Sequence, residues 1–317
     1  MGVTGILLAN LITALAFAVY TGIVFFPKIR LAFNKSQSVE TLKYSLPLIP
    51  HTLSFWAINM MDRVLMNNLS NAAATGIYSV GNQVGSTMNV VSSSVNQAYS
   101  PWFYDVIRNP EKNTAVVISM TRKLASLYCL IALTLSLFSQ EAIALLTNAK
   151  YHDSWMVIPV VAFGCVFLGY YHFFANVILL EKKTKALAVI SVCTGIISIA
   201  MNVLLIPAFG GMGAAFAGTI SYTITSFAAF FVARNMRPDI RFRALEMYSL
   251  LFFMAGISGV SYLGSFMPVV FFLAVKILLL LAVVGFLTYK NKKELKQLWL
   301  KTRLKWQKEN QVVLSSN

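Results

Sequence analysis

The chain consists of long apolar runs separated by short polar connections. A helix that crosses the hydrocarbon core of a membrane needs about 20 mostly apolar residues, and about nine runs reach that length. They cover residues 3–26, 45–69, 73–100, 122–146, 156–180, 186–206, 211–233, 244–264 and 269–289. The pattern therefore predicts an all-α polytopic membrane protein with about nine transmembrane helices.

The basic residues predict which connections share one side of the membrane. All of the 26 Lys and Arg except Arg63, Lys150 and Lys276 lie in alternate connections or in the C-terminal tail. These basic clusters fall within residues 28–43, 108–123, 182–185, 234–243 and 290–308. Because Lys and Arg are enriched in cytoplasmic loops, we expect these segments and the C-terminus in the cytoplasm, and the N-terminus outside.

Composition agrees with this prediction. The chain is 57% hydrophobic and 12% charged, whereas about a quarter of the residues of a soluble domain are charged. The net charge of +15 lies in juxtamembrane loops, where it orients helices and meets lipid headgroups, so we expect no nucleic-acid partner. Cys129, Cys165 and Cys193 lie in apolar runs without a CxxC pattern or a His at ligand spacing. We therefore expect no disulfide, no metal site and no cofactor.

Two charged residues lie deep within an apolar run. Asp62 and Arg63 fall about two-thirds of the way along the segment 45–69, where a charge costs about 2.5–3.5 kcal/mol to insert. Adjacent residues of a helix point about 100° apart, so each side chain needs a partner elsewhere. In the functional interpretation, Arg63 binds an anionic headgroup such as a diphosphate, and Asp62 balances it or binds a coupling cation. In the structural one, they form an ion pair near the outer surface, with Arg63 reaching outward.

The next run carries a polar stripe at helical spacing. It consists of Asn82, Ser86, Asn89, Ser93 and Asn96. Amides and hydroxyls facing lipid would lack hydrogen-bond partners, so the stripe should face a hydrated cavity or another helix. A cavity lined in this way suits the hydroxyl groups of sugars, which both donate and accept hydrogen bonds. Hydrogen bonding between helices is the alternative.

Lys276 is the remaining charged candidate within a run. It lies inside the last apolar segment, 269–289. It could bind an acidic group or a lipid phosphate of the substrate. It could equally extend toward the outer membrane surface as an ordinary long side chain.

A short sequence recurs near both ends of the chain. GVTGILLANLI at residues 2–12 shares two Gly, one Ala and one Ile, at the same spacing, with GGMGAAFAGTI at residues 210–220. Chance is one explanation, because Gly and Ala are common in membrane helices. Internal duplication is the other, and it would place about five further helices ahead of Met1, giving the repeated halves that are typical of transporters.

Two stretches resemble the Wzx-type oligosaccharide flippases of the multidrug/oligosaccharidyl-lipid/polysaccharide exporter superfamily. Residues 202–222 are similar to the hairpin between the eleventh and twelfth helices of that family. Residues 45–81 are similar to its seventh helix, with Pro47 and Pro50 at the cytoplasmic end, Asp62 and Arg63 deep in the helix, and Gly76-Ile77-Tyr78 opening the next helix.

The resemblance implies a two-lobe, inverted-V fold of about 12 to 14 helices, of which this chain lacks the first five. Residues 1–44 would then be the last helix of the N-terminal lobe with a basic interlobe loop, and residues 45–243 the six-helix C-terminal lobe. Residues 244–289 would form two additional helices. Residues 290–317 would be a basic cytoplasmic tail, either lying on the inner leaflet as a helix or solvated.

The resemblance also implies a function. It is the translocation of a polyprenyl-diphosphate-linked oligosaccharide across the bacterial cytoplasmic membrane, for surface polysaccharides such as O-antigen, by alternating access. Membrane lipid, this substrate and other polysaccharide-assembly membrane proteins are the expected partners, and no catalytic residue is needed. A drug or cation exporter of the same superfamily, and a membrane-embedded glycan polymerase or glycosyltransferase, are the alternatives. A fragment lacking the first lobe is expected to be inactive alone.

Overall fold

The computed structural model describes residues 2–26, 35–46, 48–108, 114–266 and 269–290. Every element in these ranges is a helix, so the chain is all-α as expected. The chain divides into two compact units, Met1–Ser45 and Leu46–Asn317. The expected basic tail at 290–317 lies outside the described residues, apart from Lys290.

The first unit contains two helices. α1, Gly2–Phe25, is apolar along its whole length, and none of its spanning window is buried within the protein. α2, Lys35–Ser45, is a polar helix with Lys43 in its last turn. The basic connection expected over these residues therefore contains a short helix, which the charge pattern alone did not predict.

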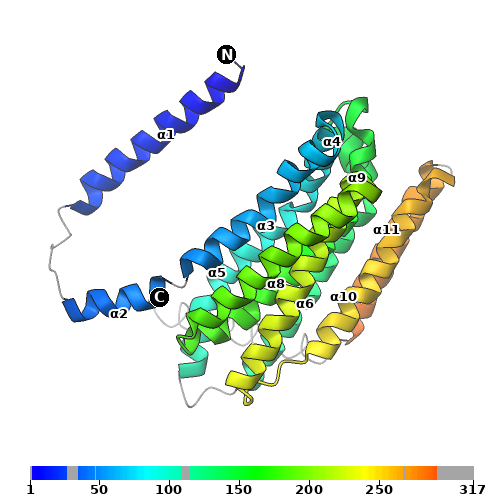
Figure 1. Ribbon diagram of the computed structural model, residues 1–317. Helices are drawn as coiled ribbons and strands as arrows, with labels where there is room; N and C mark the ends of the chain where they lie inside the picture. The colour runs from blue at the N-terminus through cyan, green and yellow to red at the C-terminus, as the bar shows by residue number, and fades with distance from the viewer. Residues whose placement is uncertain (1, 27–34, 47, 109–113, 267–268, 291–317) are drawn as a thin grey trace, which may run out of the picture. The chain divides into compact units, whose positions relative to one another are not determined.

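The second unit contains the remaining helices, which Figure 1 shows from blue (α3) to orange (α11). They are α3 (Leu48–Leu69), α4 (Ala72–Gly85), α5 (Thr87–Arg108), α6 (Thr114–Leu137), α7 (Ser139–Leu146), η2 (Ala149–Met156), α8 (Val157–Leu180), α9 (Thr184–Met236), α10 (Ala244–Ser258), η3 (Gly259–Phe266) and α11 (Val269–Lys290). The division of this unit into a six-helix lobe and two additional helices stays a prediction.

Each predicted apolar segment corresponds to one helix or to consecutive helices. Within the described residues, 6 helices are long and apolar enough to cross a membrane, and one of them is the 53-residue α9, which covers two predicted segments. α3 and α5 do not reach that hydropathy, because they carry Asp62, Arg63 and much of the polar stripe, and α4 has only 14 residues. Two of the three predicted segments that are not counted separately are therefore 45–69 and 73–100, and the third is part of α9, which counts once for two predicted segments.

α8 forms the centre of the second unit. Of its spanning window, 89% is buried within the protein, a far larger share than for any other candidate span among the described residues. α8 packs against α4, α5, α6 and α9, and aromatic rings fill the contacts. The rings of Tyr128 and Phe173, for example, stack with centroids 5.7 Å apart. A helix that is apolar on all sides is expected in such a central position.

α9 turns back on itself at the position that the sequence predicted. Gly210 has φ 56° and ψ −132°, a conformation that L side chains rarely adopt. Just beyond the turn, a Cβ on Gly213 would lie 2.2 Å from the Leu205 carbonyl oxygen. Glycine at both positions therefore allows the two arms of α9 to form a tight hairpin.

The predicted segment 73–100 is two helices, which is a correction to the sequence interpretation. α4 ends at Gly85, and the backbone N–H of Ser86 donates to the Asn82 carbonyl oxygen at 2.8 Å. α5 then continues beyond the predicted end to Arg108, with Pro101 inside it. The interruption lies in the polar stripe, where Ser and Asn side chains compete for backbone hydrogen bonds.

Candidate functional site

A cavity of about 220 Å³ lies among α3, α4, α5, α8 and α9. Its walls combine charged, amide and hydroxyl side chains with small and apolar ones. The lining residues are Ile58, Asn59, Met60, Asp62, Arg63, Tyr78, Asn82, Ser86, Asn89, Val90, Val161, Cys165, Ala214, Ala215, Gly218, Thr219 and Tyr222. Both predicted charged residues of α3 and three residues of the predicted stripe thus share one cavity.

Asp62 is buried and hydrogen-bonded on both oxygens. Only 7% of the Asp62 residue is exposed. The Tyr78 hydroxyl of α4 donates to Oδ2, and the backbone N–H of Arg63 donates to Oδ1 at 2.7 Å. Hydrogen bonds to a carboxylate are stronger than those between neutral groups. The α3–α4 contact therefore holds Asp62 in place at the cavity wall.

Arg63 lies beside Asp62 with most of its donors unused. Its Nη1 donates weakly to the Met60 sulfur at 3.9 Å, and its buried Nε has no hydrogen-bond partner in the structure. Among the described residues, no carboxylate forms an ion pair with Arg63. A guanidinium carries five N–H donors, so this side chain can bind an anion in the cavity without first breaking a salt bridge.

The polar stripe divides into two parts. Asn82, Ser86 and Asn89 line the cavity, whereas Asn96 accepts a hydrogen bond from the Asn176 amide of α8 at 2.9 Å. Ser93 lies between these parts and donates to Asn89 Oδ1 at 3.3 Å. The cavity interpretation thus fits the first three residues, and hydrogen bonding between helices accounts for Asn96.

Three side chains of the cavity were not singled out from the sequence. Tyr78 holds Asp62, and Tyr222 on the second arm of α9 donates to Asn59 Oδ1 at 2.8 Å. Asn59 could have been found, since it lies three residues before Asp62 and therefore on the same helix face. Tyr78 lies four residues before Asn82 and so shares the face of the polar stripe, whereas Tyr222 had no such signal, because its role depends on how separate helices pack.

Lys276 is not part of this cavity. It is fully buried, and its Nζ donates to both carboxylate oxygens of Glu141, at 2.8 and 2.9 Å. The ammonium also lies 4.3 Å from the centre of the Phe272 ring. The acidic group that Lys276 binds in this structure is therefore Glu141 of the protein itself, and the contact joins α11 to α7. Its role as a substrate residue stays a prediction that this geometry does not favour.

Replacing Glu141 is expected to lower the stability of the folded protein more than replacing Lys276. Glu141→Gln leaves Lys276 as an uncompensated buried charge, a change that typically costs about 3–5 kcal/mol. Lys276→Met leaves Glu141, whose side chain is 39% exposed and can be solvated, so we expect a loss of about 1 kcal/mol. Thermal unfolding of the purified protein in detergent measures both. The double variant should recover most of the loss, and equal losses in the two single variants would contradict this account.

Among the described residues, no group of three or more His, Cys, Asp and Glu could hold a metal ion. The chemistry that the described site offers is therefore electrostatic and hydrogen-bonding. It provides a guanidinium with free donors, a fixed carboxylate and a set of amides and hydroxyls.

A family model and a curated protein match parts of this chain. Residues 1–156 match a family described as polysaccharide biosynthesis protein. Over 107 residues, the chain is 25% identical to the Lsg locus putative protein 1 of Haemophilus influenzae, an alignment that covers 33% of this chain and 27% of that protein. The family description points to the synthesis of polysaccharides.

One solved structure shows a similar fold. The lipid II flippase MurJ, in its inward closed conformation, is similar with a TM-score of 0.59 at 16% identity, over 87% of this chain and 59% of that chain. The MATE transporter VcmN of Vibrio cholerae, in its bent form, has a TM-score of 0.44 at 20% identity, over 74% of this chain and 55% of its own. The likeness to MurJ shows that this chain shares that protein's helical fold. The chain thus spans about a quarter of the Haemophilus protein and 59% of MurJ.

Proposed function

We propose that this protein takes part in flipping a polyprenyl-diphosphate-linked oligosaccharide across the bacterial cytoplasmic membrane, as Wzx-type flippases do. The family match and the flippase-type fold support a membrane transporter that serves polysaccharide synthesis. The observation that carries the proposal is the cavity that contains Arg63, Asp62 and the amides of Asn82 and Asn89.

Each group in the cavity has a role in this proposal. Arg63 binds the diphosphate, since a guanidinium matches phosphate oxygens with parallel hydrogen bonds. Asn82, Ser86 and Asn89 bind the hydroxyls of the first sugar. Asp62 balances the charge of Arg63 or binds a coupling cation while Tyr78 keeps it in place. No covalent bond is made or broken, so the protein acts as a transporter and not as an enzyme.

The size of the cavity limits what it can hold. Pockets for drug-sized ligands are about 300–1,000 Å³, whereas this one is about 220 Å³. The cavity therefore accommodates the headgroup and not a whole oligosaccharide. We propose that the remaining glycan occupies space between this lobe and a second lobe, which opens and closes by alternating access. The lipid tail stays in the bilayer.

The topology follows from the charge pattern. Arg108 lies at the end of α5 and Lys183 in the connection before α9, and both positions are predicted to share the cytoplasmic side. In this orientation the C-terminus is cytoplasmic, and the headgroup enters from the side on which lipid-linked oligosaccharides are made. Other membrane proteins of polysaccharide assembly are the proposed partners, because they supply and consume the flipped lipid.

Deleting the gene in its host tests this proposal. We expect surface polysaccharide to be lost and the lipid-linked oligosaccharide to accumulate on the cytoplasmic side. Periodate added to intact spheroplasts oxidises only outward-facing glycan, so the accumulated lipid should become oxidised only after lysis. Accumulation of single repeat units that are already accessible in intact spheroplasts would contradict flipping and indicate a polymerase instead. Normal surface polysaccharide in the deletion strain would also overturn the proposal.

A further inference from the structure

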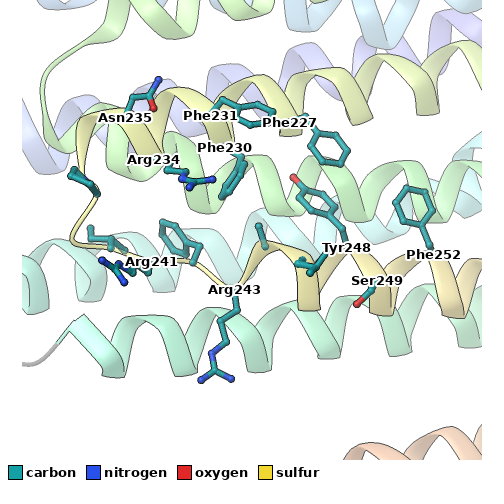
Figure 2. A pocket seen from close by; sticks show the side chains of 15 residues that line it. Phe227, Phe230, Phe231, Arg234, Asn235, Arg241, Arg243, Tyr248, Ser249 and Phe252 are labelled. Carbon is teal, nitrogen blue, oxygen red and sulfur yellow. The ribbon is translucent and has the colours of Figure 1, made fainter.

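A second and much larger groove lies at the basic end of the second unit. It has a volume of about 1250 Å³ and is formed by the last turns of α9, the connection that follows, and the first turns of α10. Figure 2 shows Phe227, Phe230 and Arg234 between the two helices, whereas Arg243 points away from α9. Apart from α9, the groove shares no element with the cavity around Asp62 and Arg63.

The groove stays open because of how α10 packs. α10 contacts α6 and α8 more closely than it contacts α9. Tyr248 of α10 is fixed against α9 at the bottom of the groove. Its ring stacks on Phe227 with centroids 4.2 Å apart, and its hydroxyl lies 2.7 Å from the Ser226 hydroxyl. Phe252 remains 57% exposed. The walls are thus a fixed aromatic surface in a segment predicted to lie in the membrane.

Two arginines at the mouth of the groove have no partner among the described residues. The nearby acids are bound to other arginines. Arg237 donates to both oxygens of Asp239, at 2.8 and 2.9 Å, and Arg243 donates to Glu246 at 3.0 Å. Arg234 and Arg241 are exposed, and the structure contains no hydrogen bond or ion pair of either side chain with a described residue.

The acid in the connection is already paired with another arginine. Arg237 donates to both oxygens of Asp239, and these hydrogen bonds lower the pKa of that carboxyl below its usual value. The negative charge of Asp239 is therefore engaged by Arg237. Arg234 and Arg241 form an uncompensated positive pair beside an apolar surface.

We propose that this groove binds one anionic phospholipid, with its phosphate at Arg234 and Arg241 and an acyl chain along Phe227, Phe230 and Phe252. Guanidinium groups bind phosphate with charge-assisted hydrogen bonds, and an acyl chain covers aromatic surface that would otherwise contact mobile lipid. The chain's own tail after residue 290 is predominantly basic, so charge repulsion disfavours it as the occupant. This lipid is bound in addition to the transported substrate and does not depend on the proposed function.

The test uses the whole chain, purified in detergent and titrated with phosphatidylglycerol. Native mass spectrometry counts the bound lipids, and phosphatidylcholine with the same acyl chains is the zwitterionic comparison. The variant is Arg234→Gln with Arg241→Gln. A matched control is Lys183→Gln with Lys185→Gln, which removes the same charge from exposed residues of another basic connection.

We expect the arginine double variant to bind phosphatidylglycerol about 30-fold more weakly, since each basic residue near an anionic lipid contributes about five-fold. The lysine control should keep the parent affinity. Inorganic phosphate should not displace the lipid, because it lacks the acyl chain. Equal binding by the two double variants, no preference over phosphatidylcholine, or displacement by free phosphate would each overturn the proposal. A photoreactive phosphatidylglycerol should crosslink to α9 or α10, and crosslinking elsewhere would also contradict it.

Discussion

The Arg63→Gln protein is expected to flip its lipid-linked substrate about 10- to 100-fold more slowly than the parent protein. A hydrogen bond to a charged group contributes about 1.5–3 kcal/mol, and each 1.4 kcal/mol is a factor of ten. Arg63 has free donors in the cavity and no ion pair among the described residues. Its loss should therefore weaken substrate binding without unfolding the lobe. The rate of appearance of outward-facing glycan in cells or proteoliposomes measures the effect.

Three further variants make this experiment specific. Arg63→Lys keeps the charge but loses the paired donors, so an intermediate rate is expected. Arg108→Gln removes an exposed arginine outside the cavity and serves as the control. Asp62→Asn can still accept the Tyr78 hydrogen bond, so it should lose the dependence on a cation gradient more than substrate binding. Equal rates for Arg63→Gln and the parent would exclude the guanidinium as the headgroup ligand.

The helix positions could be predicted from the sequence because each helix that crosses a membrane must be about 20 residues long and mostly apolar. Each predicted apolar run corresponds to one or two helices, and the turn at Gly210 lies between the predicted segments 186–206 and 211–233. α3 is one of the helices that fall short of the hydropathy of a typical membrane span. It carries Asp62 and Arg63, whose side chains face a cavity, and a helix on a cavity need not be apolar throughout.

The partners of the polar residues could not be predicted in the same way. Helical spacing places Asn82, Ser86, Asn89, Ser93 and Asn96 on one face, but it does not say which helix that face meets. In the structure, Asn96 accepts a hydrogen bond from Asn176, whereas Asn82 lines the cavity. Lys276 shows the same limit, because its partner Glu141 lies 135 positions earlier in the sequence. Contacts between distant segments depend on packing, which a one-dimensional pattern does not contain.

The whole proposal depends on the cavity being hydrated, and cysteine reactivity tests this directly. Cys129, Cys165 and Cys193 are first replaced by Ala, and single cysteines are then placed at position 82, 89 or 96. Only a thiolate reacts with a charged methanethiosulfonate reagent, and burial in apolar surroundings raises the thiol pKa. Because each unit of that shift lowers the thiolate fraction about ten-fold, Asn82→Cys and Asn89→Cys should react at least about ten-fold faster than Asn96→Cys.

Two comparisons decide how the reactivity is interpreted. Val189→Cys, at an apolar position that is 62% exposed on α9, reports reaction at a surface predicted to face lipid and should be as slow as Asn96→Cys. A neutral, membrane-permeant reagent shows that every thiol can react at all. Addition of lipid-linked substrate should protect Asn82→Cys and Asn89→Cys, since the headgroup would then occupy the cavity. If those two positions react no faster than Val189→Cys, the amides lie in a dry contact between helices, and a polar headgroup has no path through this lobe.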